Sequence, residues 1–118
     1  MTDTSSLLPL AVTMGDPAGC GPQITSLAWQ TLHAEGGTSF YVVGDPSVFP
    51  GPTRKIAAPS EAADVFSSAL PVLETSTKLG TIETGTPDQK AAPAILESIE
   101  LASAHALQGM AGGVVTNP

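Results

Sequence analysis

The 118-residue sequence contains little cysteine, little positive charge and no long apolar run, and each shortage excludes a class of protein. Cys20 is the only cysteine, which excludes a disulfide within the chain and a metal cluster held by cysteines. The formal net charge is −7, with only four lysine and arginine residues, so no basic patch is available for nucleic acid or anionic lipid. No stretch approaches the ~18 apolar residues of a membrane span, and residues 1–6 lack the pattern of a signal peptide. The sequence therefore predicts a cytoplasmic protein that binds neither nucleic acid nor a membrane.

The length of the chain indicates one small domain. Its first 35 residues predict a strand, a glycine-rich loop and a helix. The apolar residues 8–12 are typical of a buried strand, and the pattern of residues 22–35 is typical of an amphipathic helix. Trp29 lies to one side of the apolar stripe, so we expect it to cover the edge between helix and sheet rather than bind a cofactor. The stripe itself is expected to consist of Ile24, Leu27, Ala28 and Leu32.

The loop between strand and helix, Gly15–Pro22, is longer and more specialised than a simple connection requires. Its three glycines permit positive φ and the close approach of another molecule, while its two prolines restrict the backbone. Amides near residues 19–23 are expected to point out of a helix N-terminus at the C-terminal edge of a strand, which favours anions. The known glycine fingerprints fail, because Ile24 replaces the third glycine of G-x-G-x-x-G and no lysine follows. From spacing alone, a ligand-binding loop and a purely structural turn both remain open.

Three stretches carry a more specific resemblance. Residues 12–24 read VTMGDPAGCGPQI, residues 41–46 read YVVGDP, and residues 114–118 read VVTNP. The first closely resembles the N-terminal signature of the 4-hydroxythreonine-4-phosphate dehydrogenase family. The second is similar to that family's second strand with its Gly-Asp-Pro turn, and the third to the start of its Thr-x-Pro-Ile-x-Lys motif. The resemblance therefore extends from about residue 8 to the last residue.

The resemblance implies an α/β fold like that of isocitrate and isopropylmalate dehydrogenases. We expect a three-layer parallel or mixed sheet with helices on both faces, incomplete at the C-terminus. The implied parent enzyme oxidises 4-phosphooxy-L-threonine with NAD or NADP, and the product decarboxylates to 3-amino-2-oxopropyl phosphate in pyridoxal 5'-phosphate biosynthesis. It also implies a homodimer in which histidines from both subunits hold a divalent metal, with ligands expected downstream of residue 118.

The candidate cofactor-binding residues share the predicted C-terminal edge of the sheet, where α/β proteins gather their sites. We expect them to border the nicotinamide-ribose side of the cofactor. For Asp16, a hydrogen bond to a ligand and an Asx-type turn onto the amides of residues 18–21 fit the local pattern equally well. No catalytic or metal-binding residue is assigned within the chain. The candidate set is Gly15, Asp16, Pro17, Ala18, Gly19, Gly21, Thr116 and Asn117.

Five other residues are of chemical interest, and four of them are expected to be structural: Cys20, His33, Asp45 and His105. Cys20 stands where the family usually has isoleucine and is expected to be a small buried hydrophobe. Gln23 replaces the family's more usual glutamate, which keeps hydrogen bonding but removes a charge. His33 and His105 are expected on helix surfaces or final turns, because neither belongs to a metal-ligand pair. Asp45 precedes a proline and is expected to start a turn rather than bind a ribose.

The middle of the chain predicts a second strand and a short helix. Residues 39–43 are β-branched and aromatic, and they complete a parallel, right-handed βαβ unit at 8–44. A short strand at 55–57 precedes a helix at 61–69 that Ser60 would cap. The residues expected to face inward from that helix are Ala62, Val65, Phe66 and Ala69.

The last third predicts a loop, a long helix and a final strand. A brief strand at 72–73 leads into a loop at 75–86, and Thr86 begins a capping-box pattern for a helix that reaches Gln108. Pro93 is expected to kink this helix or to restart it. Residues 113–116 are typical of a strand. The predicted apolar face of the helix consists of Ile95, Ile99, Ala102 and Ala106, widened by Leu96, Ser103 and Leu107, with Glu97 and Glu100 toward solvent.

The sequence stops just beyond that strand, which indicates that residues 1–118 are an N-terminal part of a dehydrogenase whose remainder is absent. We expect no dehydrogenase turnover from these residues alone. Two alternatives stay open. One is a relative that acts on D-threonate or D-erythronate 4-phosphate, and the other is a non-catalytic α/β fragment in which the glycine loop is only a turn.

Overall fold

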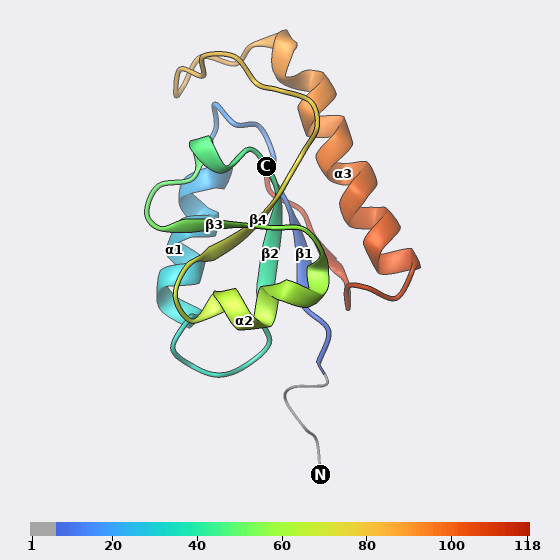
Figure 1. Cartoon of the computed structure of the whole chain (residues 1–118). Coiled ribbons are helices and arrows are strands. Elements are labelled where there is room, and N and C mark those ends of the chain that lie inside the picture. Colours follow the sequence, from blue (N-terminus) through green and yellow to red (C-terminus); the bar gives the residue numbers. More distant parts are fainter. Residues whose placement is uncertain (1–6) are drawn as a thin grey trace.

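Five parallel strands form one sheet in the computed structural model, which describes residues 7–118 (Figure 1). The order across the sheet is β3–β4–β2–β1–β5, and each neighbouring pair is parallel. The strands are β1 (Leu10–Thr13), β2 (Phe40–Gly44), β3 (Thr53–Ile56), β4 (Leu70–Glu74) and β5 (Val114–Val115). The helices are α1 (Gly21–Leu32), α2 (Ala62–Phe66) and α3 (Ala92–Leu107), with 3₁₀ turns η2 (Pro46–Val48), η3 (Pro59–Glu61) and η4 (Gln89–Ala91). Within residues 7–118, no helix is both long enough and apolar enough to cross a membrane.

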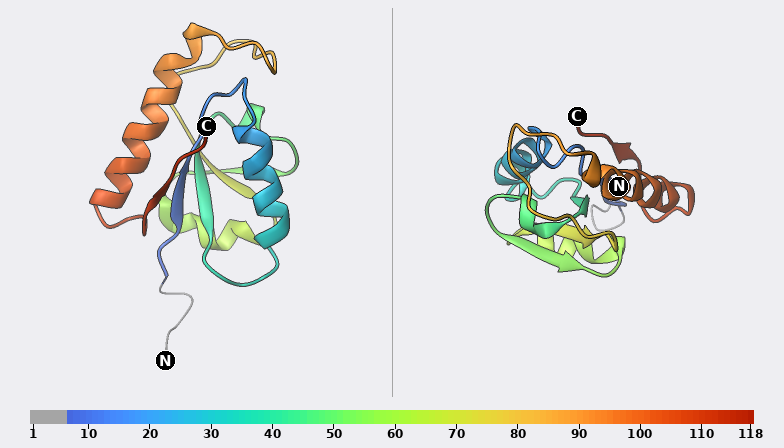
Figure 2. Two further views of the ribbon diagram at one scale, coloured as in Figure 1. Left: turned by 180° about the vertical axis from the view of Figure 1, so that it is seen from behind. Right: turned by 90° about the horizontal axis from the view of Figure 1, so that it is seen from above.

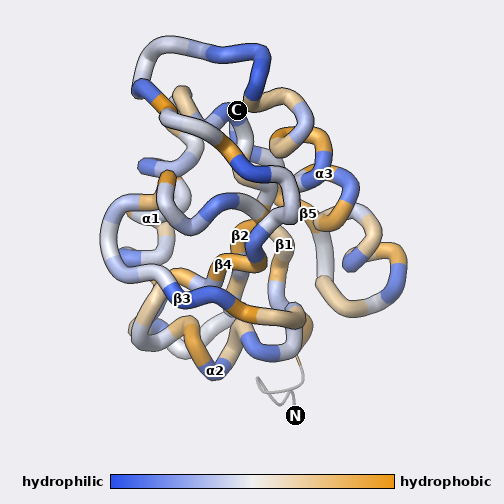
Figure 3. Tube along the Cα trace, turned by 45° about the horizontal axis from the view of Figure 1, so that its top comes forward, coloured by the Kyte–Doolittle hydropathy of each residue, from blue (hydrophilic) through white to orange (hydrophobic). Residues whose placement is uncertain are grey.

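Helices cover both faces of the sheet, so the predicted three-layer α/β arrangement is confirmed. Figure 2 shows α1 and α3 on opposite sides of the strands. Successive side chains of a strand point to opposite faces, so β1 and β2 each contribute to two apolar clusters. Val12 and Val42 pack with Trp29 of α1, whereas Tyr41 packs with Ala102 of α3. Every residue of β2 is buried, and the apolar strands lie in the middle of the molecule (Figure 3).

The predicted pairing of the first two strands is confirmed, and β4 is longer and more central in the sheet than predicted. β1 and β2 are parallel neighbours in a register that runs from Leu10–Phe40 to Thr13–Val43. β4 was predicted as only two residues, yet it has five and lies between β2 and β3. Pro71, expected only to end the preceding helix, lies inside this strand. A proline in a short apolar run hides the strand signal, because prolines are usually confined to edges or strand starts.

Two predicted helix starts are wrong. Asp88, and not Thr86, caps the turn before the long helix, because its Oδ1 accepts a hydrogen bond from the backbone N–H of Lys90 at 2.9 Å. α3 then begins at Ala92, so the predicted restart at Pro93 is confirmed. The proline lies in the first turn, where its missing N–H breaks no helical hydrogen bond, and no kink is needed.

The start of the short helix is stabilised by Glu61 rather than by Ser60. Its Oε2 accepts hydrogen bonds from the backbone N–H groups of Ala57 and Ala58, both at 2.8 Å. α2 itself ends at Phe66, earlier than predicted. The inward-facing set is confirmed: Ala62, Val65, Phe66 and Ala69 are all buried.

The predicted buried stripe of α1 is wrong. Ile24 and Leu27 are 47% and 60% exposed, whereas Thr25 and Trp29 are buried. The Trp29 indole Nε1 donates a hydrogen bond to the backbone oxygen of Phe66 at 2.7 Å. A large aromatic side chain with a satisfied N–H contributes more buried area than smaller aliphatic residues, so it decides which side of the helix faces the sheet. The structural interpretation of Trp29 is therefore confirmed, although the tryptophan is in the core.

Polar side chains occupy buried positions on α3. Ser98 is completely buried, and its Oγ accepts from the backbone N–H of Met14 at 2.9 Å and donates to the oxygen of Val43 at 2.5 Å. His105 lies in the last turn of α3, as one of its two predicted placements has it, but it is buried and not on the helix surface. Its Nδ1 lies 2.7 Å from the hydroxyl of Tyr41. Burial raises the pKa of Tyr41 to about 12 and lowers the pKa of His105, so both groups are neutral near pH 7 and share one hydrogen bond.

One edge of the sheet is apolar and open on both faces in the described residues. β5 pairs only with β1, and Val114 and Val115 are 38% and 46% exposed. On the α1 side, an apolar groove of about 210 Å³ is lined mainly by Leu10, Val12, Ile24, Ala28, Leu32, Phe40 and Val115. On the α3 side, part of the predicted apolar face is exposed and not buried as expected, namely Leu96, Ile99 and Leu107.

Candidate functional site

Segments that follow β1, β2, β4 and β5 meet at the edge formed by the strands' C-termini (Figure 1). Two of them matter most here: the glycine loop (Gly15–Pro22) after β1 and the β4–α3 segment (Thr75–Asp88). The chain passes from β1 to β2 on one side, and it returns from β4 to β5 on the other side of β1. In open parallel sheets, ligands bind where the crossovers diverge in this way. The candidate site is therefore this edge.

Two glycines of the loop are required by the protein's own packing. Gly15 has a φ of +72°, and a side chain there would overlap the carbonyl oxygen of Pro118. A Cβ on Gly21 would lie 3.0 Å from the oxygen of Met14 and 3.1 Å from the Cβ of Asn117. Gly19 is different, because a Cβ there would meet no atom closer than 3.4 Å and the residue is exposed. Close approach at Gly15 and Gly21 is thus made by the end of β5, and only Gly19 leaves its surface free.

The two candidate residues that follow β5, Thr116 and Asn117, differ in how far the protein's own hydrogen bonds occupy them. The backbone N–H of Asn117 donates to Oγ1 of Thr13 at 3.1 Å, and its Nδ2 donates to the Thr13 oxygen at 2.9 Å and to Oγ1 of Thr25 at 2.7 Å. These three bonds tie β5 to β1 and α1. Thr116 is exposed at the same edge.

Asp16 forms the Asx-type turn that was one of its two interpretations. Its Oδ1 accepts from the backbone N–H of Ala18 at 2.9 Å, and its backbone oxygen accepts from Gly19 at 2.9 Å. Its own N–H donates to the oxygen of Pro118 at 3.0 Å. The loop is therefore held rigidly by internal bonds, while the half-buried Asp16 still lines the space beside it.

Pro17 lines several clefts, of which two differ most in the charge of their lining. The first, which we call the acidic cleft, has a volume of about 310 Å³ and is lined by Asp16, Pro17, Ala18, Thr81, Ile82, Glu83, Thr86, Pro87, Asp88 and Ala91. The second, the helix-end cleft, has a volume of about 300 Å³ and is lined by Pro17, Gly19, Pro22, Gln23, Ser47, Val48, Phe49, Pro50 and Thr84. The acidic cleft has three carboxylates and no lysine or arginine in its lining. The helix-end cleft has no charged lining residue and lies at the N-terminus of α1, whose first turn contains no acidic residue. The two clefts therefore differ in the charge that they favour.

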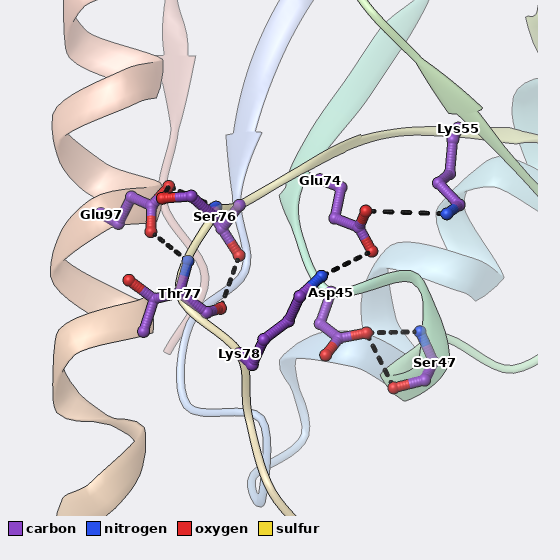
Figure 4. Close-up of polar contacts among 9 residues, drawn as sticks. Asp45, Ser47, Lys55, Glu74, Ser76, Thr77, Lys78 and Glu97 are labelled. Atoms are coloured by element: carbon purple, nitrogen blue, oxygen red, sulfur yellow. Dashed lines mark hydrogen bonds and ion pairs between the residues drawn. The ribbon is translucent and has the colours of Figure 1, made fainter.

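The β4–α3 segment lines both clefts, and two of its anchors are hydrogen-bonded contacts with α3 and with the glycine loop. Figure 4 shows the first anchor, in which the Glu97 carboxylate accepts hydrogen bonds from Ser76 and Thr77. Burial raises the pKa of Glu97, but the hydrogen bonds from Thr77 and Ser76 outweigh that effect and lower it to about 2. The second anchor is the backbone N–H of Gly85, which donates to the oxygen of Ala18 in the glycine loop at 2.8 Å. The segment is thus tied to α3 at its start and to the glycine loop near its end.

Other residues singled out from the sequence have clear positions. Cys20 is exposed at the N-cap of α1, so its predicted burial is wrong; the loop turns outward between the flanking glycines. Gln23 is exposed and lines the helix-end cleft. His33 follows α1, as predicted for a final turn, and its ring stacks on Trp29 with centroids 4.4 Å apart. Asp45 is a turn residue, because its Oδ1 accepts from the N–H and hydroxyl of Ser47.

Comparisons with known proteins converge on one family. No family model matches the sequence. Proteins named 4-hydroxythreonine-4-phosphate dehydrogenase from Bradyrhizobium diazoefficiens and Caulobacter vibrioides are each 40% identical to this chain over 93% of its length. Over nearly its whole length, the chain is similar to proteins of the 4-hydroxythreonine-4-phosphate dehydrogenase family. It spans 36% and 34% of those two relatives, or about a third of their length.

Solved structures of the 4-hydroxythreonine-4-phosphate dehydrogenase family have the same fold. The enzyme of that name from Klebsiella pneumoniae matches with a TM-score of 0.74 and 30% identity, over 98% of this chain and 38% of that chain. The Burkholderia phymatum protein matches with a TM-score of 0.82 over 95% of this chain and 36% of that chain, and at 20% identity it shows the fold alone.

The sequence indicated the glycine loop but not the opposite side of the two clefts. Glu83 and Asp88 lie in a stretch with weak periodicity, and Glu97 was placed toward solvent. The acidic spacing of the 83–88 stretch was the only available signal. Its partners lie about 70 residues away in the glycine loop, so local pattern could not reveal the cleft.

Proposed function

We propose that this chain supplies the glycine-loop side of the cofactor site in an NAD- or NADP-dependent dehydrogenase that oxidises 4-phosphooxy-L-threonine. The observation that carries the proposal is the 40% identity to dehydrogenases of that name, combined with two clefts on either side of the most distinctive motif. In this proposal the product decarboxylates to 3-amino-2-oxopropyl phosphate, a precursor of pyridoxal 5'-phosphate.

The residues that line the clefts fit the nicotinamide-ribose half of such a cofactor. Carboxylates accept hydrogen bonds from sugar hydroxyls and from a carboxamide N–H, and they repel phosphate. Asp16, Glu83 and Asp88 therefore suit the ribose and nicotinamide in the acidic cleft. A phosphate suits the helix-end cleft, where Gly19 and Ser47 stand at the positive end of α1. The bound nicotinamide would accept the hydride, and the chain's own part is to orient it.

The metal and the dimer are proposed for the longer family protein and not for these residues. Within residues 7–118, no three histidine, cysteine, aspartate or glutamate side chains are grouped so that they could hold a metal ion. We expect the divalent metal ligands to come from chain beyond Pro118, and the phosphorylated substrate to be held there as well.

Calorimetric titration of the 118-residue protein with NAD, NADP and inorganic phosphate tests this proposal. We expect NAD or NADP to bind and the protein alone to show no oxidation of 4-phosphooxy-L-threonine. The matched variant is Gly19→Val, which places a branched side chain on the one loop glycine whose surface is free. Equal binding by Gly19→Val, or no binding of either dinucleotide by the unmodified protein, would contradict a cofactor surface at this loop.

A further inference from the structure

Few contacts hold the β4–α3 segment, although it lines both clefts. Its residues 80–88 are almost all exposed. Ile82 and Thr84 stand opposite Pro17 across the clefts, and Thr81 and Glu83 line the acidic cleft. The width of the space beside the glycine loop therefore depends on where this segment is held.

Glu97 is the side chain that holds the start of the segment. Its Oε2 accepts from the backbone N–H of Ser76 at 2.6 Å and from the Ser76 hydroxyl at 2.9 Å, and its Oε1 accepts from the backbone N–H of Thr77 at 2.8 Å. One carboxylate thus takes up three donors from two consecutive residues, and hydrogen bonds to a charged group are stronger than neutral ones. The neighbouring ion pairs of Glu74 with Lys55 and Lys78, at 3.6 and 3.8 Å, are exposed and contribute little (Figure 4).

The far end of the segment is joined to the glycine loop itself. Gly85 donates to the oxygen of Ala18, and Ala18 lines the acidic cleft. Leu79 packs against the apolar cluster beneath the sheet edge. Thr75, directly after β4, is buried, and its backbone N–H donates to the Gly44 oxygen at 3.1 Å. If Glu97 released Ser76 and Thr77, the attachments beyond Thr75 would be Leu79 and Gly85, and Thr81–Thr84 could move away from Pro17.

We propose that Glu97 is a positioning residue that holds the β4–α3 segment against the glycine loop and so sets the shape of the cofactor clefts. The proposal rests on the proposed function for its ligand. Glu97 does not line either cleft, so it acts through Ser76 and Thr77.

Amide hydrogen exchange of the protein without ligand tests the structural part. Glu97→Gln replaces one acceptor oxygen with an NH₂ group that faces an N–H donor. We expect faster exchange at Ser76 and Thr77 and also at Gly85. Glu100→Gln, an exposed carboxylate on the same helix, is the matched control and is expected to leave these amides unchanged. Unchanged exchange in Glu97→Gln would overturn the proposal, and Ser76→Ala, which removes one donor, gives a second test if Glu97→Gln does not fold.

Titration with NAD tests the functional part. The comparison is made at a temperature where Glu97→Gln and the unmodified protein are both folded, as an unchanged thermal midpoint of unfolding shows. If the segment is displaced about nine-tenths of the time in Glu97→Gln, NAD affinity falls about tenfold, because apparent affinity scales with the competent fraction. Equal NAD affinity in Glu97→Gln and the unmodified protein, with exchange accelerated, would overturn the positioning role. No NAD binding by the unmodified protein would instead overturn the proposed function, and the exchange comparison would still decide whether Glu97 holds the segment.

Discussion

The Ser98 hydroxyl is a single atom on which two strands and the base of the glycine loop depend. It accepts from Met14, the residue before Gly15, and donates to Val43 in β2. Ser98→Ala removes both hydrogen bonds in a place with no access to water. A buried donor without a partner costs about 1–3 kcal/mol, and the lost bond to the Val43 oxygen adds about 1 kcal/mol. Since only one oxygen atom is removed, the cavity contributes little, and we expect the free energy of unfolding to fall by about 2–4 kcal/mol.

Urea denaturation followed by Trp29 fluorescence measures this loss, because Trp29 is the single tryptophan and is buried. Exchange of the Met14 amide gives a local measure at the loop itself, and it is expected to be faster in Ser98→Ala. The matched control is Ser103→Ala, a half-buried serine on the same helix, with an expected change of about 0.5 kcal/mol or less. A loss in Ser98→Ala no larger than in the control, with the Met14 amide still protected, would refute the reasoning.

Two further predictions concern the same sheet edge and the buried pair below it. Gly15→Ala is expected to destabilise the protein by about 2–4 kcal/mol in urea denaturation, since it combines a positive φ with overlap at Pro118, whereas Gly37→Ala, where a Cβ meets nothing, should be nearly neutral. Because burial lowers the pKa of His105 below its ordinary 6.5, the unfolded chain binds the proton first as pH falls. The contribution of neutral, buried His105 to stability is therefore fully present above about pH 6.5 and is lost as the pH falls below that value. A urea midpoint that stays constant from pH 7.5 to 5, or that falls equally in His105→Gln, would contradict this.

The sequence was sufficient for β1, β2 and the glycine loop because their signals are local. β1, β2 and the glycine loop each carry their pattern within a few residues, and the predicted βαβ pairing follows from them. The orientation of the helices could not be predicted in the same way. On α1 the aliphatic stripe through Ile24 predicts one buried face. The helix instead buries the face that carries Trp29, whose indole N–H donates to the Phe66 oxygen.

Buried polar residues were the other source of error. Ser98 and His105 resemble surface residues in a helical pattern, yet each is buried because a partner from a distant strand satisfies it. Those partners are 84 and 64 residues away. The same applies to the candidate site, since the segment opposite the glycine loop is brought there by Glu97, and no periodicity in that segment predicts it.

The open edge at β5 has a consequence for how the protein behaves in solution. In the described residues β5 is the outermost strand, and exposed valine side chains and backbone groups on such a strand can pair with another chain. Leu107, which is 89% exposed, adds further apolar surface. The net charge of −7 opposes such contacts by mutual repulsion, which fades once the Debye length shrinks to about 8 Å at physiological ionic strength. Colloidal behaviour should thus depend on salt: dilute buffer keeps molecules apart, and added sodium chloride promotes clustering at unchanged protein concentration.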